Sequence, residues 1–167
     1  MAKKGKSFYL KVAIMFANAS QRYFRKLVKL NPQIINYPAL IKKTNLTTHG
    51  FDYRYKIITI KEWQEIINIF NQLMEDEPYV SDFRDCDNHA FAFTSWCGWV
   101  LKINSAGSVY GKLYHDDGRF IGGHYWNILP TKDKTYFYDP IKEKIFDFGK
   151  EAKLGDRVYK PEYSYFF

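Results

Sequence analysis

Cys86, His124 and Asp139 carry the side chains that nucleophilic acyl transfer requires. Asp85 is typical of a helix N-cap, so Cys86 falls in the first turn of a predicted helix. There the helix dipole favours a thiolate, and an unpaired backbone amide is available to stabilise an oxyanion. His124 lies on a predicted strand as the general base, and Asp139 ends the next strand, where it would orient the imidazole. The order of these residues and their predicted elements together indicate a thiol acyl-transfer site.

Each of these residues also has a purely structural interpretation. A cysteine at a helix start can pack in a core, a Gly-Gly-His sequence can form a turn, and Asp139 before Pro140 is typical of a turn. Trp126 and Asn127 follow His124 directly. Trp126 would form a wall of the site and Asn127 would bond a ligand, unless strand alternation places one of them in the core.

The elements that position these residues predict an α+β fold, with helices first and an antiparallel sheet after them. A helix from Ser7 should end near Pro32, and a capping box of Thr59 and Glu62 should open the next. The nucleophile helix should run from Asp85 to about Leu101 and pack on the sheet. A loop around a short helix is expected at 33–50, a hairpin turn at 115–118, and strands at 51–58, 108–113, 123–129, 135–138 and 144–148.

The length of 167 residues indicates a single domain. Within it we expect four parts in chain order. They are a disordered tail at 1–6, a basic helical part at 7–78, the thiol-enzyme core at 79–148, which starts with a linker to residue 84, and a C-terminal extension at 149–167.

Cys86, His124 and Asp139, in this order, resemble the papain-like and transglutaminase-like cysteine peptidase superfamily. Over about residues 79–148, three segments are similar to small phage and prokaryotic proteins that resemble the C-terminal papain-like domain of the Marasmius oreades agglutinin. These segments are SDFRDCDNHAFAF, GGHYWNIL and YFYDP. The resemblance implies a papain-like fold, a Cys86 nucleophile, a His124 base, an Asp139 orienter, and a protein or peptide substrate that passes through a thioester acyl-enzyme.

The resemblance also implies calcium, because the agglutinin domain is a calcium-dependent protease. Asp87 would be the main metal ligand, and Asp85 a weaker candidate. The sequence departs from the family pattern at three positions: Asn88 replaces an acid, His89 replaces an aromatic residue, and Tyr125 replaces an alanine. Asp139 stands in place of a glutamate. Apart from this resemblance, the two cysteines and four histidines show no metal-ligand spacing.

Charge is unevenly distributed along the chain. Residues 1–51 contain ten Lys or Arg and no Asp or Glu, so the net charge of +7 at pH 7 comes from this part. Such a concentration predicts that residues 3–43 contact nucleic acid. The alternatives are a solvated basic face, or one that docks against the acidic remainder of the chain.

The sequence predicts a protein of a reducing compartment: the cytoplasm, or the host cytoplasm if the protein is viral. It shows no secretory signal and no apolar run of the roughly 18 residues that would predict a membrane partner. Cys86 and Cys97 would lie roughly 16 Å apart on one helix, which is too far for a disulfide.

Three functions are compatible with these patterns. The first is a cysteine hydrolase, a peptidase or amidase of phage or viral origin. The second is a catalytically silent module of the same fold, such as a phage accessory protein or host-defence antagonist, that binds through its basic N-terminal half. The third is a cell-wall amidase of the CHAP type, against which the bulky Asp87-Asn88 pair and the absence of an export signal count.

Overall fold

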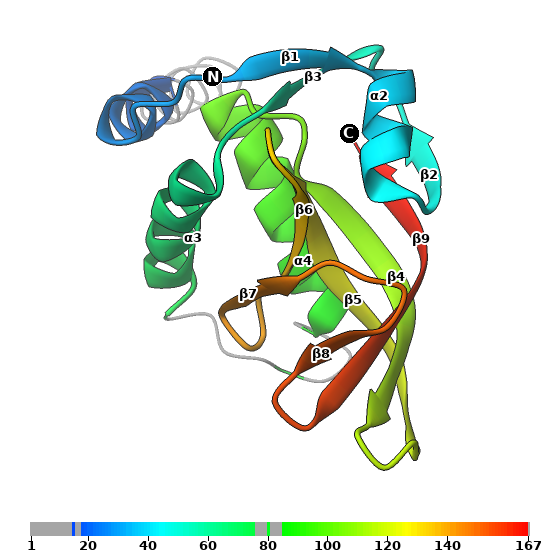
Figure 1. The fold of residues 1–167 in the computed structure, drawn as a ribbon. Coiled ribbons are helices and arrows are strands. Elements are labelled where there is room, and N and C mark those ends of the chain that lie inside the picture. Colours follow the sequence, from blue (N-terminus) through cyan, green and yellow to red (C-terminus); the bar gives the residue numbers. More distant parts are fainter. Residues whose placement is uncertain (1–14, 16–17, 76–79, 81–84, 167) are drawn as a thin grey trace, which may run out of the picture.

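A curved sheet of seven strands forms the centre of the molecule (Figure 1). The structure is a computed structural model that describes residues 15, 18–75, 80 and 85–166. The predicted tail at 1–6 and nearly all of the predicted linker at 79–84 lie outside the described residues. The combination of helices and sheets confirms the α+β class.

The strands of the main sheet follow the order β2-β9-β4-β5-β6-β7, and β8 pairs with β9. The pairings are antiparallel except that edge strand β2 runs parallel to β9. The expectation of an antiparallel sheet is therefore correct for every pair but one. The strands are β2 (Thr47–Gly50), β4 (Gly107–His115), β5 (Phe120–Pro130), β6 (Thr135–Asp139), β7 (Lys144–Asp147), β8 (Ala152–Leu154) and β9 (Arg157–Phe166).

Strand β9 is the main element that the sequence did not predict, because residues 149–167 were expected to be an extension. Pro161 lies inside this strand, where a proline normally argues against a strand. The register between β4 and β9 shifts between Tyr110 and Gly111, and Pro161 lies opposite Gly111 at that irregularity. A Cβ added at Gly111 would clash with the Lys160 carbonyl oxygen, so glycine permits the close approach of the two strands.

The helices begin where their capping residues predict. Helix α3 (Ile60–Met74) opens on the Thr59–Glu62 capping box, with the Thr59 hydroxyl 2.7 Å from Glu62 Oε2. Helix α4 (Cys86–Trp96) follows the N-cap Asp85 and continues as a π-helical turn, Cys97–Leu101. The helix predicted from Ser7 is present at 18–27, and it ends ahead of Pro32. The predicted loop at 33–50 contains β1 (Gln33–Asn36), α2 (Tyr37–Thr44) and β2, and β1 pairs with β3 (Arg54–Ile57).

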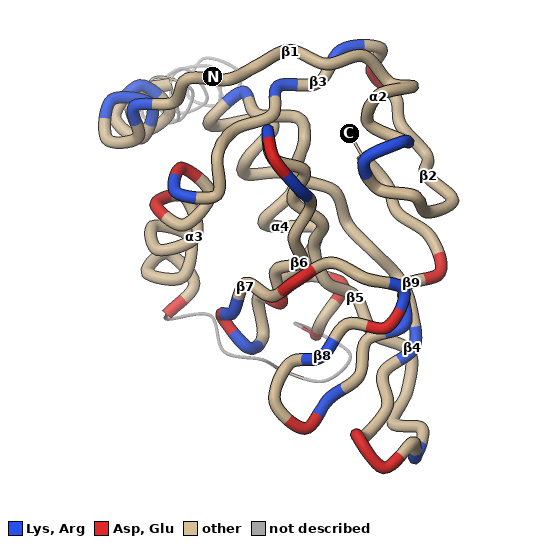
Figure 2. Tube along the Cα trace, in the orientation of Figure 1, with Lys and Arg blue, Asp and Glu red and all other residues tan. Residues whose placement is uncertain are grey.

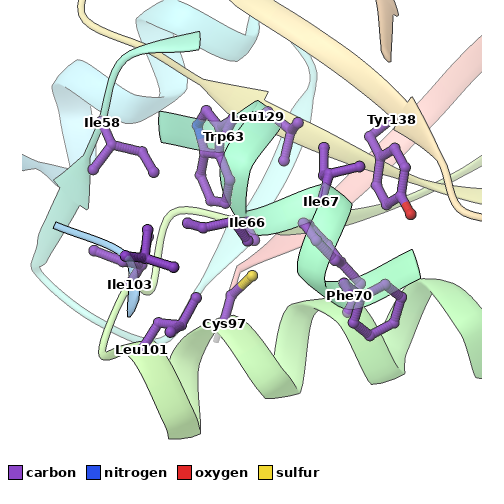
Figure 3. Close-up of a cluster of buried hydrophobic side chains, with 13 residues drawn as sticks. Ile58, Trp63, Ile66, Ile67, Phe70, Cys97, Leu101, Ile103, Leu129 and Tyr138 are labelled. Carbon is purple, nitrogen blue, oxygen red and sulfur yellow. The ribbon is translucent and has the colours of Figure 1, made fainter. Parts of the chain in front are cut away.

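Two hydrophobic clusters lie on opposite faces of the sheet. The first joins α3 and α4 to the sheet and includes Trp63, Phe93, Cys97, Leu129 and Tyr138 (Figure 3). The second lies inside the curve of the sheet and includes Trp126, Ile128, Phe137, Tyr159 and Phe166. Alternate residues of β5 therefore serve different clusters.

No helix among the described residues is long and apolar enough to cross a membrane. Cys86 and Cys97 are both free thiols, as predicted. Cys97 is fully buried, and this burial raises the pKa of its thiol, so it has the environment of a core residue.

Candidate active site

Cys86 is the first residue of α4, and its thiol is partly exposed. The Asn88 side chain accepts the Asp85 backbone N–H at 3.4 Å, which helps to fix the start of the helix. Because the first N–H groups of a helix have no partner within it, the backbone around Cys86 presents donors and the positive end of the dipole to the thiol. Cys86 therefore lies in the first turn of its helix, as the sequence predicted.

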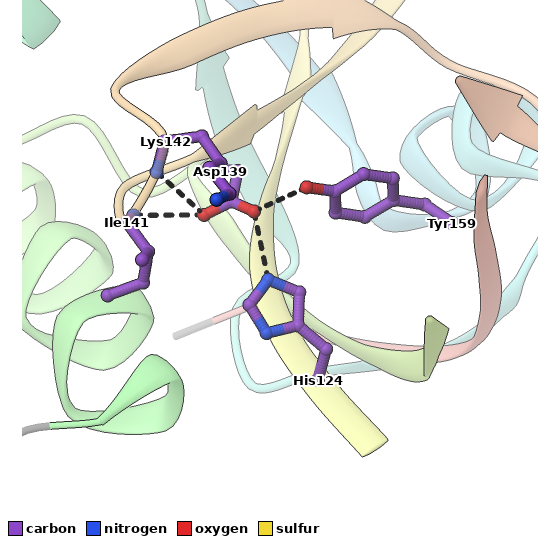
Figure 4. A network of polar contacts seen from close by, with 5 residues as sticks. All are labelled: His124, Asp139, Ile141, Lys142 and Tyr159. Carbon is purple, nitrogen blue, oxygen red and sulfur yellow. Dashed lines mark hydrogen bonds and ion pairs between the residues drawn. The ribbon is translucent and has the colours of Figure 1, made fainter. Parts of the chain in front are cut away.

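His124 and Asp139 meet at the end of the paired part of two strands (Figure 4). β6 pairs with β5 only over Asn127–Pro130, so at His124 it no longer covers that side of β5. His124 Nε2 lies 2.9 Å from Asp139 Oδ2. This contact leaves Nδ1 of the ring for the Cys86 thiol.

Asp139 is fully buried, and both of its carboxylate oxygens are bonded. Oδ1 accepts the backbone N–H groups of Ile141 at 2.9 Å and Lys142 at 3.3 Å, which is an Asx-type turn around Pro140. Oδ2 accepts the Tyr159 hydroxyl at 2.7 Å as well as facing His124. The turn and the site were alternatives for Asp139 in the sequence, but the structure uses one oxygen for each.

The electrostatics of this group favour a charged histidine. Burial alone would lower the pKa of His124, but hydrogen bonds and charge interactions with Asp139 and Cys86 outweigh it and raise that pKa to about 9. Burial would raise the pKa of Asp139, yet the bonds from His124 and Tyr159 hold it below the usual carboxyl range. The raised pKa keeps the His124 imidazole protonated at neutral pH, where it faces both the Asp139 carboxylate and the Cys86 side chain.

The two accessory residues differ in their roles. Trp126 is fully buried and stacks on the His124 ring at a centroid distance of 5.8 Å, so it supports the imidazole from the core side. Asn127 faces the other way: its side-chain N–H groups donate to Ala90 O at 2.9 Å, Thr94 Oγ1 at 3.0 Å and Gly107 O at 3.2 Å. The prediction that Asn127 bonds a ligand is corrected, because strand alternation turns this fully buried amide toward α4.

The side chains of Asp85 and Asp87 lie within hydrogen-bonding distance of each other. This contact is the main cause of the raised pKa of Asp87. Calcium takes six to eight oxygen ligands. Among the described residues no group of three or more His, Cys, Asp or Glu side chains is arranged to hold a metal ion. Asp85 and Asp87 alone therefore do not fit a calcium site, and no step of the chemistry below is assigned to calcium.

Tyr159 is the site residue that sequence reasoning missed. It reaches Asp139 from β9 and is fully buried in the second cluster. Its local sequence, VYKPEY, carries no catalytic pattern. The only available signal was physical: a buried carboxylate needs more partners than one histidine provides.

The solved structures that share this fold include the following two. One is described as "PSL1a-E64 complex" and shares 18% identity with a TM-score of 0.51. The other is a Polyporus squamosus lectin bound to the human-type influenza-binding epitope Neu5Aca2-6Galb1-4GlcNAc, with 19% identity and a TM-score of 0.51. The matches cover 77% and 78% of this chain but 47% of each neighbour, so the chain spans about half their length. No family model and no curated protein matches the chain.

Proposed function

We propose that this protein is a cysteine hydrolase, a peptidase or amidase that acts through Cys86, His124 and Asp139. The observation that carries the proposal is the His124–Asp139 contact of 2.9 Å, made by a carboxylate that is buried and fully bonded. A buried charge is costly unless its partners compensate it. Tyr159, Ile141 and Lys142 hold Asp139 in place, and the pKa of His124 responds to both Asp139 and Cys86.

The proposed reaction has two steps. The Cys86 thiolate attacks the carbonyl carbon of an amide, and the His124 imidazolium gives its proton to the leaving amine as the C–N bond breaks. This step forms a thioester and a neutral imidazole. The imidazole then takes a proton from water, whose oxygen attacks the thioester carbon, and the thiolate leaves with a carboxylic acid released. Backbone N–H groups at the start of α4 would stabilise the oxyanion.

The family assignment belongs to the same proposal. We infer a papain-like or transglutaminase-like enzyme that acts on a protein or peptide in a reducing cytoplasm, where free Cys86 stays reduced. The likeness to solved structures supports the fold alone. One neighbour is described as a complex with E64, an epoxide that alkylates activated thiols, and that reagent is the natural probe for Cys86.

The test is covalent labelling by E64, followed by intact-mass and peptide mass spectrometry. We expect one addition, on Cys86, in the wild type and in Cys97→Ser, and none in Cys86→Ala. Because the thiol is partly exposed, Cys86→Ala should leave the melting temperature nearly unchanged. His124→Ala should slow labelling by about 100-fold or more. Labelling on neither cysteine, or on Cys97 alone, would exclude the thiol mechanism and leave the silent binding module.

A labelled enzyme still requires a substrate class. Incubation with a complex peptide library would show cleavage by new peptide termini, whereas release of ammonia from side-chain amides would show an amidase. Cys86→Ala is the control in both assays. Products that form equally with Cys86→Ala would count against the proposal.

A further inference from the structure

Two adjoining hollows share their lining at the end of the molecule where the N-terminal helix, β3 and the end of α4 gather. One has a volume of about 370 Å³ and is lined by residues that include Arg54, Lys56 and Lys102. The other has a volume of about 340 Å³ and is lined by residues that include Arg25, Lys56 and Lys102. Lys56 and Lys102 line both, and the two adjoining hollows together are termed the groove. Figure 2 shows Lys and Arg positions gathered on these elements.

The four cations of this groove have no carboxylate partner among the described residues. Within the described part of the chain, the Arg25 side chain bonds the neutral Gln21 side chain, at 3.0 Å. Asp52, the acid that adjoins β3, accepts instead from the Asn104 amide at 2.7 Å. The groove therefore presents positive charge that the described part of the chain does not neutralise.

The backbone of Lys102 has a left-handed conformation, which costs free energy in a residue other than glycine. It caps the π-helical turn with φ of 62°, in the left-handed region where glycine or asparagine is the usual residue. π-helical turns occur often at functional sites.

Trp99 gives the groove an aromatic neighbour. Its side chain is 70% exposed on the same π-helical turn, and Lys102 Nζ lies 5.1 Å from its ring centroid. A solvent-exposed indole, beside cations that no described carboxylate pairs with, matches the two needs of single-stranded nucleic acid, a phosphate contact and a surface for base stacking. The cations line hollows, whereas a flat bilayer surface would be met by cations that project.

We propose that this groove binds single-stranded nucleic acid, with Lys56, Lys102, Arg54 and Arg25 on phosphates and a base stacked on Trp99. The site is separate from the Cys86–His124–Asp139 group and does not depend on its activity. It also differs from the segment 3–43 in which the sequence placed a nucleic-acid contact, because β3 and the end of α4 supply three of its four cations.

The test is fluorescence anisotropy with a labelled oligothymidylate of about 12 nucleotides, titrated at several salt concentrations between about 50 and 200 mM. The double variant Lys56→Gln, Lys102→Gln should weaken binding and reduce the slope of log affinity against log salt by about 1.4, which corresponds to two phosphate contacts on a single strand. Lys150→Gln with Lys153→Gln removes the same charge from exposed positions elsewhere and should leave the slope unchanged. Trp99→Ala should weaken binding by about tenfold.

Lys102→Gly separates a binding role from a structural one. Glycine relieves the left-handed backbone, so the melting temperature should rise while oligonucleotide affinity falls. Affinity that stays unchanged in this variant would overturn the role of Lys102. The proposal as a whole is wrong if the oligonucleotide does not bind at about 50 mM salt, or if both double variants weaken binding equally. It is equally wrong if polyglutamate or phosphatidylserine vesicles bind in a Lys102-dependent way and the oligonucleotide does not.

Discussion

The contacts of the single residue Asp139 explain why the three candidate side chains form a unit. One of its oxygens is bonded by the turn that follows it, so the carboxylate cannot rotate. The other faces both His124 and Tyr159. The turn amides hold the carboxylate in place independently of the charge on His124. Asp139 can therefore orient the imidazole without a rearrangement of its own side chain.

The charge on His124 should also make stability depend on pH. Its pKa is about 9 in the folded protein, against 6.5 for an ordinary histidine. A raised pKa stabilises the fold fully below about 6.5, and the contribution is lost as pH rises through about 9. We expect the free energy of unfolding of the wild type to fall by up to about 3 kcal/mol between these values, relative to His124→Gln. Chemical denaturation of both proteins at each pH measures this difference.

The same comparison in a Cys86→Ala background shows how much of the raised pKa of His124 comes from Asp139 and how much from Cys86. This variant keeps Asp139 but removes the thiol, so the loss of stability should begin at lower pH than in the wild type. Asp139 is ionised throughout this range, and its own contribution cancels. A difference between wild type and His124→Gln that does not change with pH would show that the imidazole is neutral in the folded protein.

At the scale of elements, α4 and β5 must keep a fixed spacing if Cys86 is to meet His124. Asn127 provides the connection, since its single amide group bonds Ala90 and Thr94 of α4 and Gly107 at the start of β4. The sequence predicted both elements correctly. It could not reveal the hydrogen bonds of the Asn127 side chain. The partners of that side chain depend on how the helix packs on the sheet, which strand periodicity does not show.

We expect Asn127→Ala to lower the free energy of unfolding by about 3 kcal/mol, because it removes three buried hydrogen bonds that join β5 to α4 and β4. E64 labelling of Cys86 should slow as well, since the helix start is no longer held at its distance from β5. Asn68→Ala is the matched control: Asn68 is exposed on α3 and accepts a hydrogen bond from the exposed Gln64, so its change should stay within about 0.5 kcal/mol. Thermal and urea unfolding provide both values. Equal stability of the two variants would show that Asn127 does not join the elements.

Local signals in the sequence predicted the parts of the fold that local physics determines. The Thr59–Glu62 capping box, the start of α4 after Asp85 and the strands around His124 and Asp139 all depend on neighbours within a few residues. Strands β2 and β9 instead meet across more than a hundred residues of chain. Pro161 concealed β9, and a parallel edge pairing has no short-range pattern. The contact between His124 and Asp139 could therefore be predicted from the sequence, but the bond from Tyr159, which β9 supplies, could not.

At the scale of the whole molecule, β9 is the element on which the fold and the site both depend. It pairs with β2, β4 and β8, and it supplies Tyr159 and Phe166 to the second hydrophobic cluster. A core restricted to 79–148 would lack these partners and would leave strand β4 as an open edge. Residues 149–167 are thus integral to the sheet of the folded molecule.

Removal of residues 149–167 should therefore abolish cooperative folding, whereas Tyr159→Phe should only lower the free energy of unfolding. The phenylalanine keeps the aromatic packing and removes one buried hydrogen bond to a charged carboxylate, so we expect a loss of about 2 kcal/mol and slower E64 labelling of Cys86. Circular dichroism with thermal unfolding distinguishes the two results. If the shortened chain unfolds cooperatively and still reacts with E64, then β9 is an addition to a complete thiol-enzyme core. If it is unfolded while Tyr159→Phe retains its fold, the strand is required for the sheet, and its tyrosine has the separate task of holding Asp139.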